Sequence, residues 1–165
     1  MPDNHKRCVA LLKKAGCSSR VIGHCEAVCA RALDFSKHSD LADSSLVETG
    51  ALLHDIGRSS THSIGHAQHG ADILRKKKFP EEVVRIVECH TGAGLTADEC
   101  TLLGLLPRDC MPETIEQKIV TNADNLIAGV RRTTIDEELA DAFRLPRKTR
   151  KRMYRLACEV ELLTQ

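Results

Sequence analysis

The stretch Ala51-Leu52-Leu53-His54-Asp55-Ile56-Gly57-Arg58 places a histidine and an aspartate side by side after an apolar run typical of a helix. Neighbouring residues on a helix diverge by about 100°, so His54 and Asp55 can face one centre only where the helix ends. Gly57 belongs to the residue type that ends helices, and we expect it to end this one. We expect Gly50, one turn earlier, to leave room beside the imidazole. Two metal ligands fit this stretch, and so does a C-capping histidine beside a surface aspartate.

The composition indicates an ordinary globular chain with its own core. The chain has 165 residues, of which 42% are hydrophobic and 28% are charged, and a net charge of +1. This length fits one domain, and the balanced charge argues against a field that attracts nucleic acid or membranes. No signal sequence or membrane-spanning run is evident, so we expect a cytoplasmic protein. Of the eight cysteines, Cys25 and Cys29 lie four residues apart in an apolar run, which favours packing thiols over disulfides or a zinc site.

The remaining chain predicts one helix after another and no strand, so the expected fold class is all-α. The helices are expected over residues of about 5–15, 20–36, 44–53, 63–78, 80–90, 96–103 and 112–127, with two more beginning near 136 and 146. Their start and stop signals follow known capping preferences. These signals are Gly16 after the first helix, Ser18 or Ser19, Asp43, Ser63 and Pro80 before the next four, Thr96 with Glu99 as a capping box, and then Pro112, Asp136 and Pro146.

Further metal-ligand types occur on the inward faces of the expected helices. Taken singly, each histidine could be a core residue bonded to a carbonyl group. A lone carboxylate on an apolar face is costly unless its charge is compensated. Together with the His-Asp pair, these residues make metal binding the economical account. They are His24, His66, His90 and Asp124.

The ordered set resembles a known family. His24, His54-Asp55 and Asp124 resemble the HD-domain metal-dependent phosphohydrolases, in the variant in which Ile-Gly follows the pair. The added His66 and His90 motifs resemble the binuclear branch, which includes bacterial diadenosine tetraphosphate hydrolases, and small stand-alone archaeal HD proteins. The resemblance implies a single-domain orthogonal helical bundle over residues 1–165. Its core would cover about 18–130, and a basic helical extension about 136–165.

The resemblance also implies roles for these residues. One metal would be held by His24, His54, Asp55 and Asp124, and a second by His66, His90 and a bridging Asp55. Imidazole and carboxylate ligands suit two divalent first-row ions, iron or manganese before zinc, nickel or cobalt. A metal-bound hydroxide would then cleave a small phosphodiester, cyclic phosphate or phosphoanhydride in a nucleotide-like substrate. Asp55 and Arg58 are the expected catalytic residues, and the expected substrate-binding residues are Arg58, His69 and Arg131.

Two other functions stay open at this point. One is a mononuclear nucleoside 5′-monophosphate phosphatase that uses only His24, His54, Asp55 and Asp124. The other is a non-catalytic metal- or nucleotide-binding module whose basic tail docks a partner. The tail has seven cations between Arg144 and Arg155, but aromatic residues make up only 2% of the chain. We therefore expect a partner helix or a solvated face there rather than nucleic acid. A homo-oligomer remains open, and His62 is expected at the surface.

Overall fold

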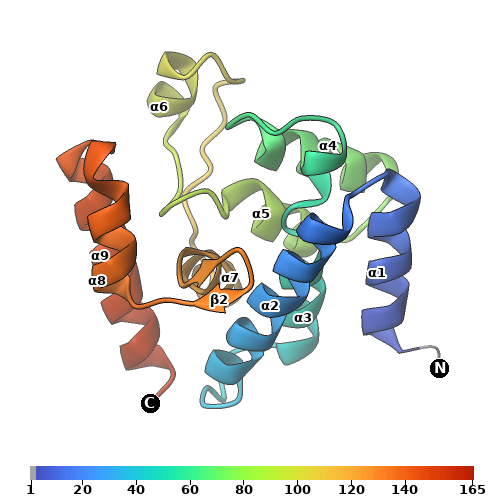
Figure 1. The fold of residues 1–165 in the computed structure, drawn as a ribbon, viewed down its shortest axis with the longest axis horizontal. Coiled ribbons are helices and arrows are strands. Elements are labelled where there is room, and N and C mark those ends of the chain that lie inside the picture. Colours follow the sequence, from blue (N-terminus) through green and yellow to red (C-terminus); the bar gives the residue numbers. More distant parts are fainter. Residues whose placement is uncertain (1–2) are drawn as a thin grey trace.

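The computed structural model describes residues 3–165 and confirms a mostly helical fold (Figure 1). The first half contains α1 (Asn4–Ala15), α2 (Ser19–Ser36), α3 (Ser44–Leu53), the 3₁₀ turn η1 (Ile56–Ser59) and α4 (His66–Lys76). The second half contains α5 (Glu81–Cys89), α6 (Ala97–Leu102), α7 (Ile115–Asn125), β1 (Ile127–Ala128), β2 (Arg131–Arg132), α8 (Ile135–Asp141), η2 (Ala142–Arg144) and α9 (Arg147–Leu163). None of the helices in this described part is long and apolar enough to cross a bilayer.

Several helix ends lie where the sequence predicts them. Gly16 takes φ 95° after α1, a left-handed conformation that glycine adopts without a steric penalty. The side chain of Ser18 accepts a hydrogen bond from the Val21 N–H at the start of α2. Asp43 does the same for two N–H groups of α3, and Thr96 forms the expected capping box before α6. These signals are reliable because each one satisfies N–H or C=O groups that every helix end leaves free.

Three predicted helix starts are wrong. Ser63 does not cap α4, which begins only at His66 after the N-cap Gly65. Pro112 does not open α7, because the Thr114 side chain caps that helix. Asp136 lies inside the first turn of α8, whose capping box starts at Thr134. In the last two cases a threonine hydroxyl close to the expected start meets the N–H three residues later, and this local hydrogen bond sets the boundary.

A short hairpin interrupts the helical order. Ile127 pairs with Arg132 and Ala128 with Arg131 in an antiparallel arrangement, so α7 ends at Asn125 and does not include Ile127 as the sequence predicted. The turn passes through Gly129 at φ 66°. Strands of two residues are too short to show an alternation of polar and apolar side chains, so no strand could be predicted here.

The core lies where α2, α3, α5 and α7 meet, with α1 against α3 and α9 against α7 (Figure 1). Fully buried side chains such as Val28 of α2, Leu52 of α3 and Ile119 of α7 fill it. A second, smaller cluster joins Cys89, Cys100 and Cys110 beneath α6. All eight cysteines are free and seven are buried, and the packing role expected for Cys25 and Cys29 is confirmed.

Candidate metal centre

The six residues that the sequence singled out as metal ligands come together at the ends and inner faces of five helices. His24 lies within α2, and Asp124 lies in the last turn of α7. His54 is the C-cap of α3, and Asp55 follows it directly before η1. The remaining two are His66, the first residue of α4, and His90, the C-cap of α5. Four of these residues are buried, and His24 and Asp124 are each about one-fifth exposed.

Backbone carbonyl groups fix the orientation of all four imidazoles. The Nδ1 atoms of His54, His66 and His90 each lie 2.7–2.8 Å from the carbonyl oxygen three residues earlier in the chain. The Nδ1 atom of His24 lies 2.7 Å from the carbonyl oxygen of Gly129 in the hairpin turn. A neutral imidazole carries one proton, so an Nδ1–H donated to a carbonyl leaves a lone pair on Nε2. Each ring therefore presents a metal-binding nitrogen.

The Nε2 atoms and the two carboxylates face one another. His24 Nε2 lies 2.9 Å and His54 Nε2 3.5 Å from Asp124 Oδ1. On the other side, His66 Nε2 lies 3.2 Å and His90 Nε2 3.6 Å from Asp55 Oδ1. The second Asp55 oxygen, Oδ2, lies 3.8 Å from His54 Nε2. Asp55 thus has one oxygen toward each group, the arrangement that a bridging carboxylate requires.

Several of these atoms lack the partner that burial demands. His54 Nε2 and Asp55 Oδ1 are fully buried and make no hydrogen bond within residues 3–165. The Nε2 atoms of His66 and His90 lie 3.1 Å apart, although both rings already use their Nδ1–H groups on carbonyls. Facing lone pairs and orphaned buried polar atoms are costly. A divalent cation would satisfy them, so the donor set fits the metal site that the sequence predicts.

The protonation states of His66 and Asp55 agree with this arrangement. Burial and the nearby His90 lower the pKa of His66 to about 4, so His66 is neutral at pH 7. Burial alone would raise the pKa of Asp55, but the neighbouring His54 and His90 outweigh it and hold that pKa below its ordinary value. A neutral imidazole and an ionised carboxylate are the forms that bind metals.

Gly57 matters for a reason other than the predicted one. It does not end α3, which stops at Leu53, and it lies in η1 with no positive φ. A Cβ atom on Gly57 would lie 1.9 Å from the carbonyl oxygen of His66 and 2.6 Å from the backbone nitrogen of Gly70. The glycine lets η1 lie directly against α4, which brings Asp55 beside His66. Gly50 likewise makes room for the Ile86 side chain, whose Cγ2 would lie 2.6 Å from an added Cβ, and not for the imidazole.

A pocket of about 400 Å³ opens onto the centre. Arg58 lies on its wall and donates a hydrogen bond of 2.6 Å from Nε to Asp55 Oδ2. Sequence reasoning missed two further wall residues, Ser18 and Arg20, although Arg20 lies one helical turn before His24 and could have been found from that spacing. The pocket is lined by Ser18, Arg20, Val21, His24, Asp55, Arg58, His62 and Gly129.

Three other residues discussed from the sequence, His62, His69 and Arg131, differ in their position relative to this pocket. His62 is exposed, as the sequence predicts, but it also lines the pocket, and no periodicity in its loop could have indicated this. His69 is exposed on α4, and Arg131 lies on β2 with its guanidinium 3.8 Å from Glu137. Neither belongs to the described residues that line the pocket. A role of His69 and Arg131 in substrate binding stays a prediction.

Comparisons with known proteins agree with this geometry. An uncharacterized protein of Methanocaldococcus jannaschii is 46% identical over 136 residues, which cover 80% of both chains. The tRNA (cytidine(56)-2'-O)-methyltransferase of Thermoplasma volcanium is 45% identical over 144 residues, which cover 87% of this chain but only 42% of that relative. Ribonuclease Y of Alkaliphilus metalliredigens is 34% identical over 100 residues, or 58% of this chain and 18% of that relative. The chain thus spans less than half of these two named enzymes.

A solved structure shares the fold. The L. monocytogenes phosphodiesterase PgpH HD domain, in complex with cyclic-di-AMP, superimposes with a TM-score of 0.57 over 88% of this chain and 91% of that one. The sequence identity is 17%, so the likeness concerns the fold alone. The family model described as HD domain matches residues 21–129, which include all six residues of the centre. This chain belongs to the HD domain family.

Proposed function

We propose that this protein is a binuclear, divalent-metal phosphohydrolase that cleaves a phosphodiester, cyclic phosphate or phosphoanhydride bond in a nucleotide-like substrate. One observation carries the proposal: four imidazoles, each oriented by a carbonyl group, turn Nε2 toward two carboxylates in a buried centre. Two groups of three residues have His54 in common, and within each group the ligand atoms lie within 4.8 Å of one another. They are His24, His54 and Asp124, and His54, Asp55 and His90.

The donor set supports two sites on either side of Asp55. His24, His54 and Asp124 would hold one ion, and His66 and His90 would hold the other, with Asp55 between them. Such mixed nitrogen and oxygen ligands suit iron or manganese, and also zinc, nickel or cobalt. When bound, divalent ions supply Lewis-acid charge that lowers the pKa of water and stabilises charge on phosphoryl oxygens.

The protein's own groups would bind and orient the substrate. Arg58 uses Nε on Asp55 Oδ2, and its Nη2 lies 3.4 Å from His66 Nε2. The remaining terminal N–H groups are available for phosphate oxygens at the pocket wall. The bond from Nε holds the Asp55 carboxylate in place between the two ligand groups. Arg20 adds a second cation to the wall, and a volume of about 400 Å³ is in the range of small-molecule sites. We propose Asp55 and Arg58 as the catalytic pair on this basis.

The relatives favour a phosphodiester as the scissile group. Ribonuclease Y and the phosphodiesterase PgpH both carry names that describe this chemistry, and PgpH was solved with a cyclic dinucleotide. The Thermoplasma relative is named for a reaction on tRNA, although this chain matches less than half of it. A diester of nucleotides is the substrate class that these names share.

The experiment counts metals and measures hydrolysis in the same preparations. The full chain is purified without chelator and without air, and its metal content is compared with turnover of bis-p-nitrophenyl phosphate and p-nitrophenyl phosphate. We expect two ions per chain and preference for the diester. His54→Ala should lose both metal and activity, and His66→Ala should lose one ion and about 100-fold in rate. His38→Ala, an exposed histidine on another surface, should change neither.

The same variants separate the alternatives. Full turnover of a monoester by His66→Ala with one ion per chain would establish a mononuclear phosphatase. Metal binding without hydrolysis of either ester, with iron, manganese or zinc supplied, would favour a non-catalytic module.

A further inference from the structure

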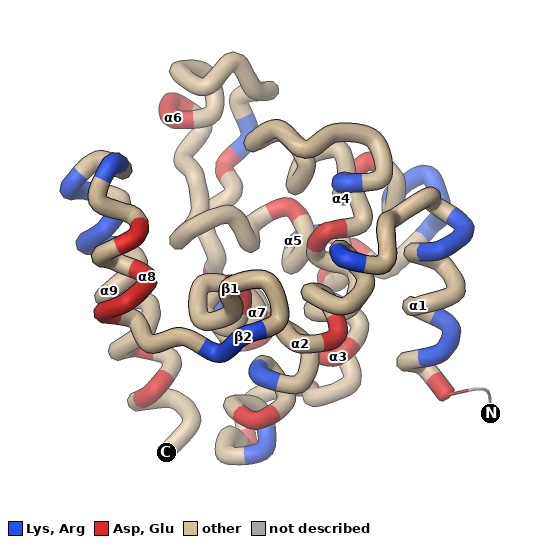
Figure 2. Tube along the Cα trace, viewed as in Figure 1, with Lys and Arg blue, Asp and Glu red and all other residues tan. Residues whose placement is uncertain are grey.

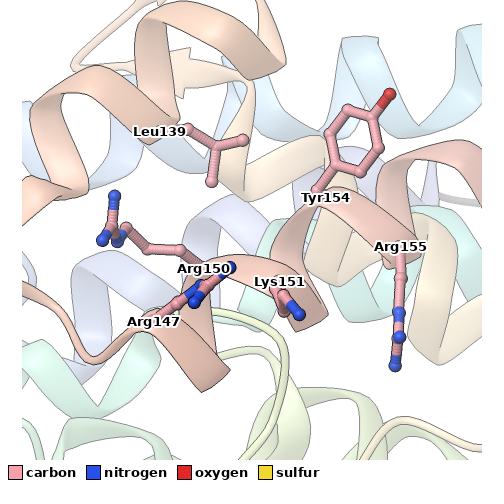
Figure 3. A pocket seen from close by; sticks show the side chains of 6 residues that line it. All are labelled: Leu139, Arg147, Arg150, Lys151, Tyr154 and Arg155. Carbon is pink, nitrogen blue, oxygen red and sulfur yellow. The ribbon is translucent and has the colours of Figure 1, made fainter.

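The C-terminal helices form a basic groove outside the residues that match the HD domain. The groove has a volume of about 420 Å³ (Figure 3). One wall is Leu139 of α8, and the other lining side chains all come from α9. We call this the basic groove, and its lining residues are Leu139, Arg147, Arg150, Lys151, Tyr154 and Arg155.

The cations of the groove have no acidic partners. Within residues 3–165, none of its four cationic side chains has a carboxylate oxygen within 4.0 Å. By contrast, the neighbouring Arg152 makes a two-pronged contact with Glu99 at 2.9–3.0 Å. Moreover, the Nε atom of Arg150 is buried without a hydrogen-bond partner among the described residues. Four uncompensated positive charges around one hollow favour an anionic occupant.

The placement of these charges costs helix stability. Residues 147–155 contain six cations and no acid, while the acids of α9 lie later, at Glu159 and Glu161. Figure 2 shows this end of α9 as a blue cluster, with the red acids of α8 beside it. Cations at a helix N-terminus oppose the helix dipole, whereas those at the end of α4 complement it. Helix stability therefore does not explain why these cations lie at the N-terminus of α9.

The spacing fits a chain of phosphates better than a single one. Positions 147, 150, 151, 154 and 155 lie on one helix face, because they are three, four, seven and eight residues apart. At 1.5 Å per residue, the stripe is about 12 Å long. A nucleic-acid strand carries one phosphate per nucleotide, so a stripe of this length can meet more than one of them.

An exposed aromatic ring lies among the same charges. The chain has only four aromatic side chains, and two of them, Phe35 and Phe79, are buried or pack against the core. The other two lie in the C-terminal segment, where Tyr154 is 50% exposed and Phe143 is 63% exposed. Cations combined with exposed rings are what single-stranded nucleic acids require, because bases stack on aromatic faces while phosphates meet the cations.

We propose that the basic groove binds single-stranded nucleic acid through its phosphate backbone, with Tyr154 stacking on a base. The expectation from sequence was a solvated face or partner helix, since aromatics are scarce. The structure places one of those scarce rings, Tyr154, half exposed among the groove cations. The proposal does not rest on hydrolysis at the metal centre, and an Asp55→Asn variant should bind as the original protein does.

The test measures fluorescence anisotropy of labelled 12-nucleotide single strands, RNA in one arm and DNA in another, with the full chain. The double variant Arg147→Gln/Lys151→Gln removes two exposed cations from the groove. The double variant Lys76→Gln/Lys77→Gln removes two exposed cations from α4 and serves as the charge-matched control. We expect the groove variant, and not the control variant, to bind about tenfold more weakly than the original protein. Its plot of log K against log salt concentration should also be shallower, with a slope smaller in magnitude by about 1.4.

Stacking gives an independent readout. Tyr154→Phe should retain affinity, while Tyr154→Ala should lose about tenfold, since the ring and not the hydroxyl meets the base. Three results would each overturn the proposal. They are no binding of either strand by the original protein, equal loss in the groove and control variants, and binding of poly-glutamate as tight as that of RNA. The last would identify an acidic polypeptide as the occupant.

Discussion

At the scale of single residues, one hydrogen bond of His54 closes the end of α3 and also orients its imidazole ring. His54 and His90 are C-caps, and each donates Nδ1–H to a carbonyl group of its own last helical turn. Such carbonyls have no partner within the helix. The capping bond is also what turns Nε2 toward the centre. Capping and metal orientation are therefore one interaction.

Gly57 gives a sharp prediction at this scale. Gly57→Ala should lower the free energy of unfolding by about 3 kcal/mol, because the new Cβ would overlap backbone atoms of His66 and Gly70, which cannot move aside like a flexible side chain. The variant should also lose metal, since η1 would move away from α4. Urea denaturation and metal content measure the two effects.

Gly23 provides the matched control. It lies within α2, and an added Cβ would meet only Val130 Cγ1, at 3.8 Å. Gly23→Ala should therefore raise the free energy of unfolding by about 0.5–1 kcal/mol. Equal stability of the two alanine variants would contradict the account of Gly57.

The role of a residue could be predicted from the sequence where it depends on neighbouring residues, and not where it depends on a distant part of the chain. The six-residue set could be proposed because histidine and aspartate side chains on apolar helix faces need a polar or charged partner, however the helices pack. Gly57 was misread because its role depends on α4, ten residues further on, and nothing nearby in sequence shows that contact. His62 could not be placed at the pocket, since a loop carries no periodic signal.

At the scale of elements, the buried carboxylate of Glu88 joins α4, α5 and the loop before α7. Arg75 of α4 binds both its oxygens at 3.0 Å. Arg85 of α5 and Arg108 of the loop approach within 2.8 and 2.9 Å. Burial would raise the pKa of Glu88, but the three arginines outweigh it and lower that pKa to about 2.

This network predicts acid sensitivity between pH 4.5 and about 2. The folded pKa lies below the ordinary value of 4.5, so ionised Glu88 stabilises the fold above that value. The stabilisation is lost as the pH falls through this range. Glu88→Gln should cost about 2 kcal/mol at pH 7 and flatten the decline of stability in acid. Unfolding by urea at several pH values measures both effects.

The exposed Glu82 on the same helix is the control, because Glu82→Gln should leave the acid profile unchanged. An acid profile of Glu88→Gln equal to that of the original protein would show that other carboxylates govern acid unfolding.

Element boundaries were predictable where a side chain closes the helix end and unpredictable where a backbone carbonyl group does. Thr96 and Glu99 close α6 reciprocally, so their motif is enough. The start of α4 is different, because the Ser63 carbonyl accepts both the N–H and the Nδ1–H of His66. Ser63 thereby positions the His66 side chain through its backbone carbonyl group. Capping preferences consider only the serine hydroxyl group, so they predicted the wrong role for Ser63.

At the scale of the whole molecule, the helical pattern predicted the fold class, but charge pairing could not be read from it. The C-terminal segment looked like a solvated face with acids ahead of the cations. Only the structure shows that Arg152 pairs with distant Glu99 while the groove cations stay unpaired. Ion pairs between residues 53 positions apart leave no mark on the local sequence, and the role of this segment is therefore a structural inference.

The centre makes one further prediction for the molecule as a whole, because five helices contribute to it. Removal of divalent ions with a chelator should lower the melting temperature by about 5–10 °C. An ion present at 100 times its Kd adds about 2.7 kcal/mol to the folded state, and a chain of this size shifts by about 2–4 °C for each kcal/mol. Manganese added back should restore the loss, as measured by the circular dichroism of the helices.

Two variants decide whether the shift comes from the proposed ligands. His54→Ala should melt at the same temperature with and without manganese, whereas His38→Ala should respond as the original protein does. The His54 side chain is the informative one to remove, because its Nε2 is buried and unpartnered among residues 3–165. An undiminished manganese response in His54→Ala would place the stabilising ion elsewhere. That result would also remove the main support for a shared centre at the ends of α3 and α5.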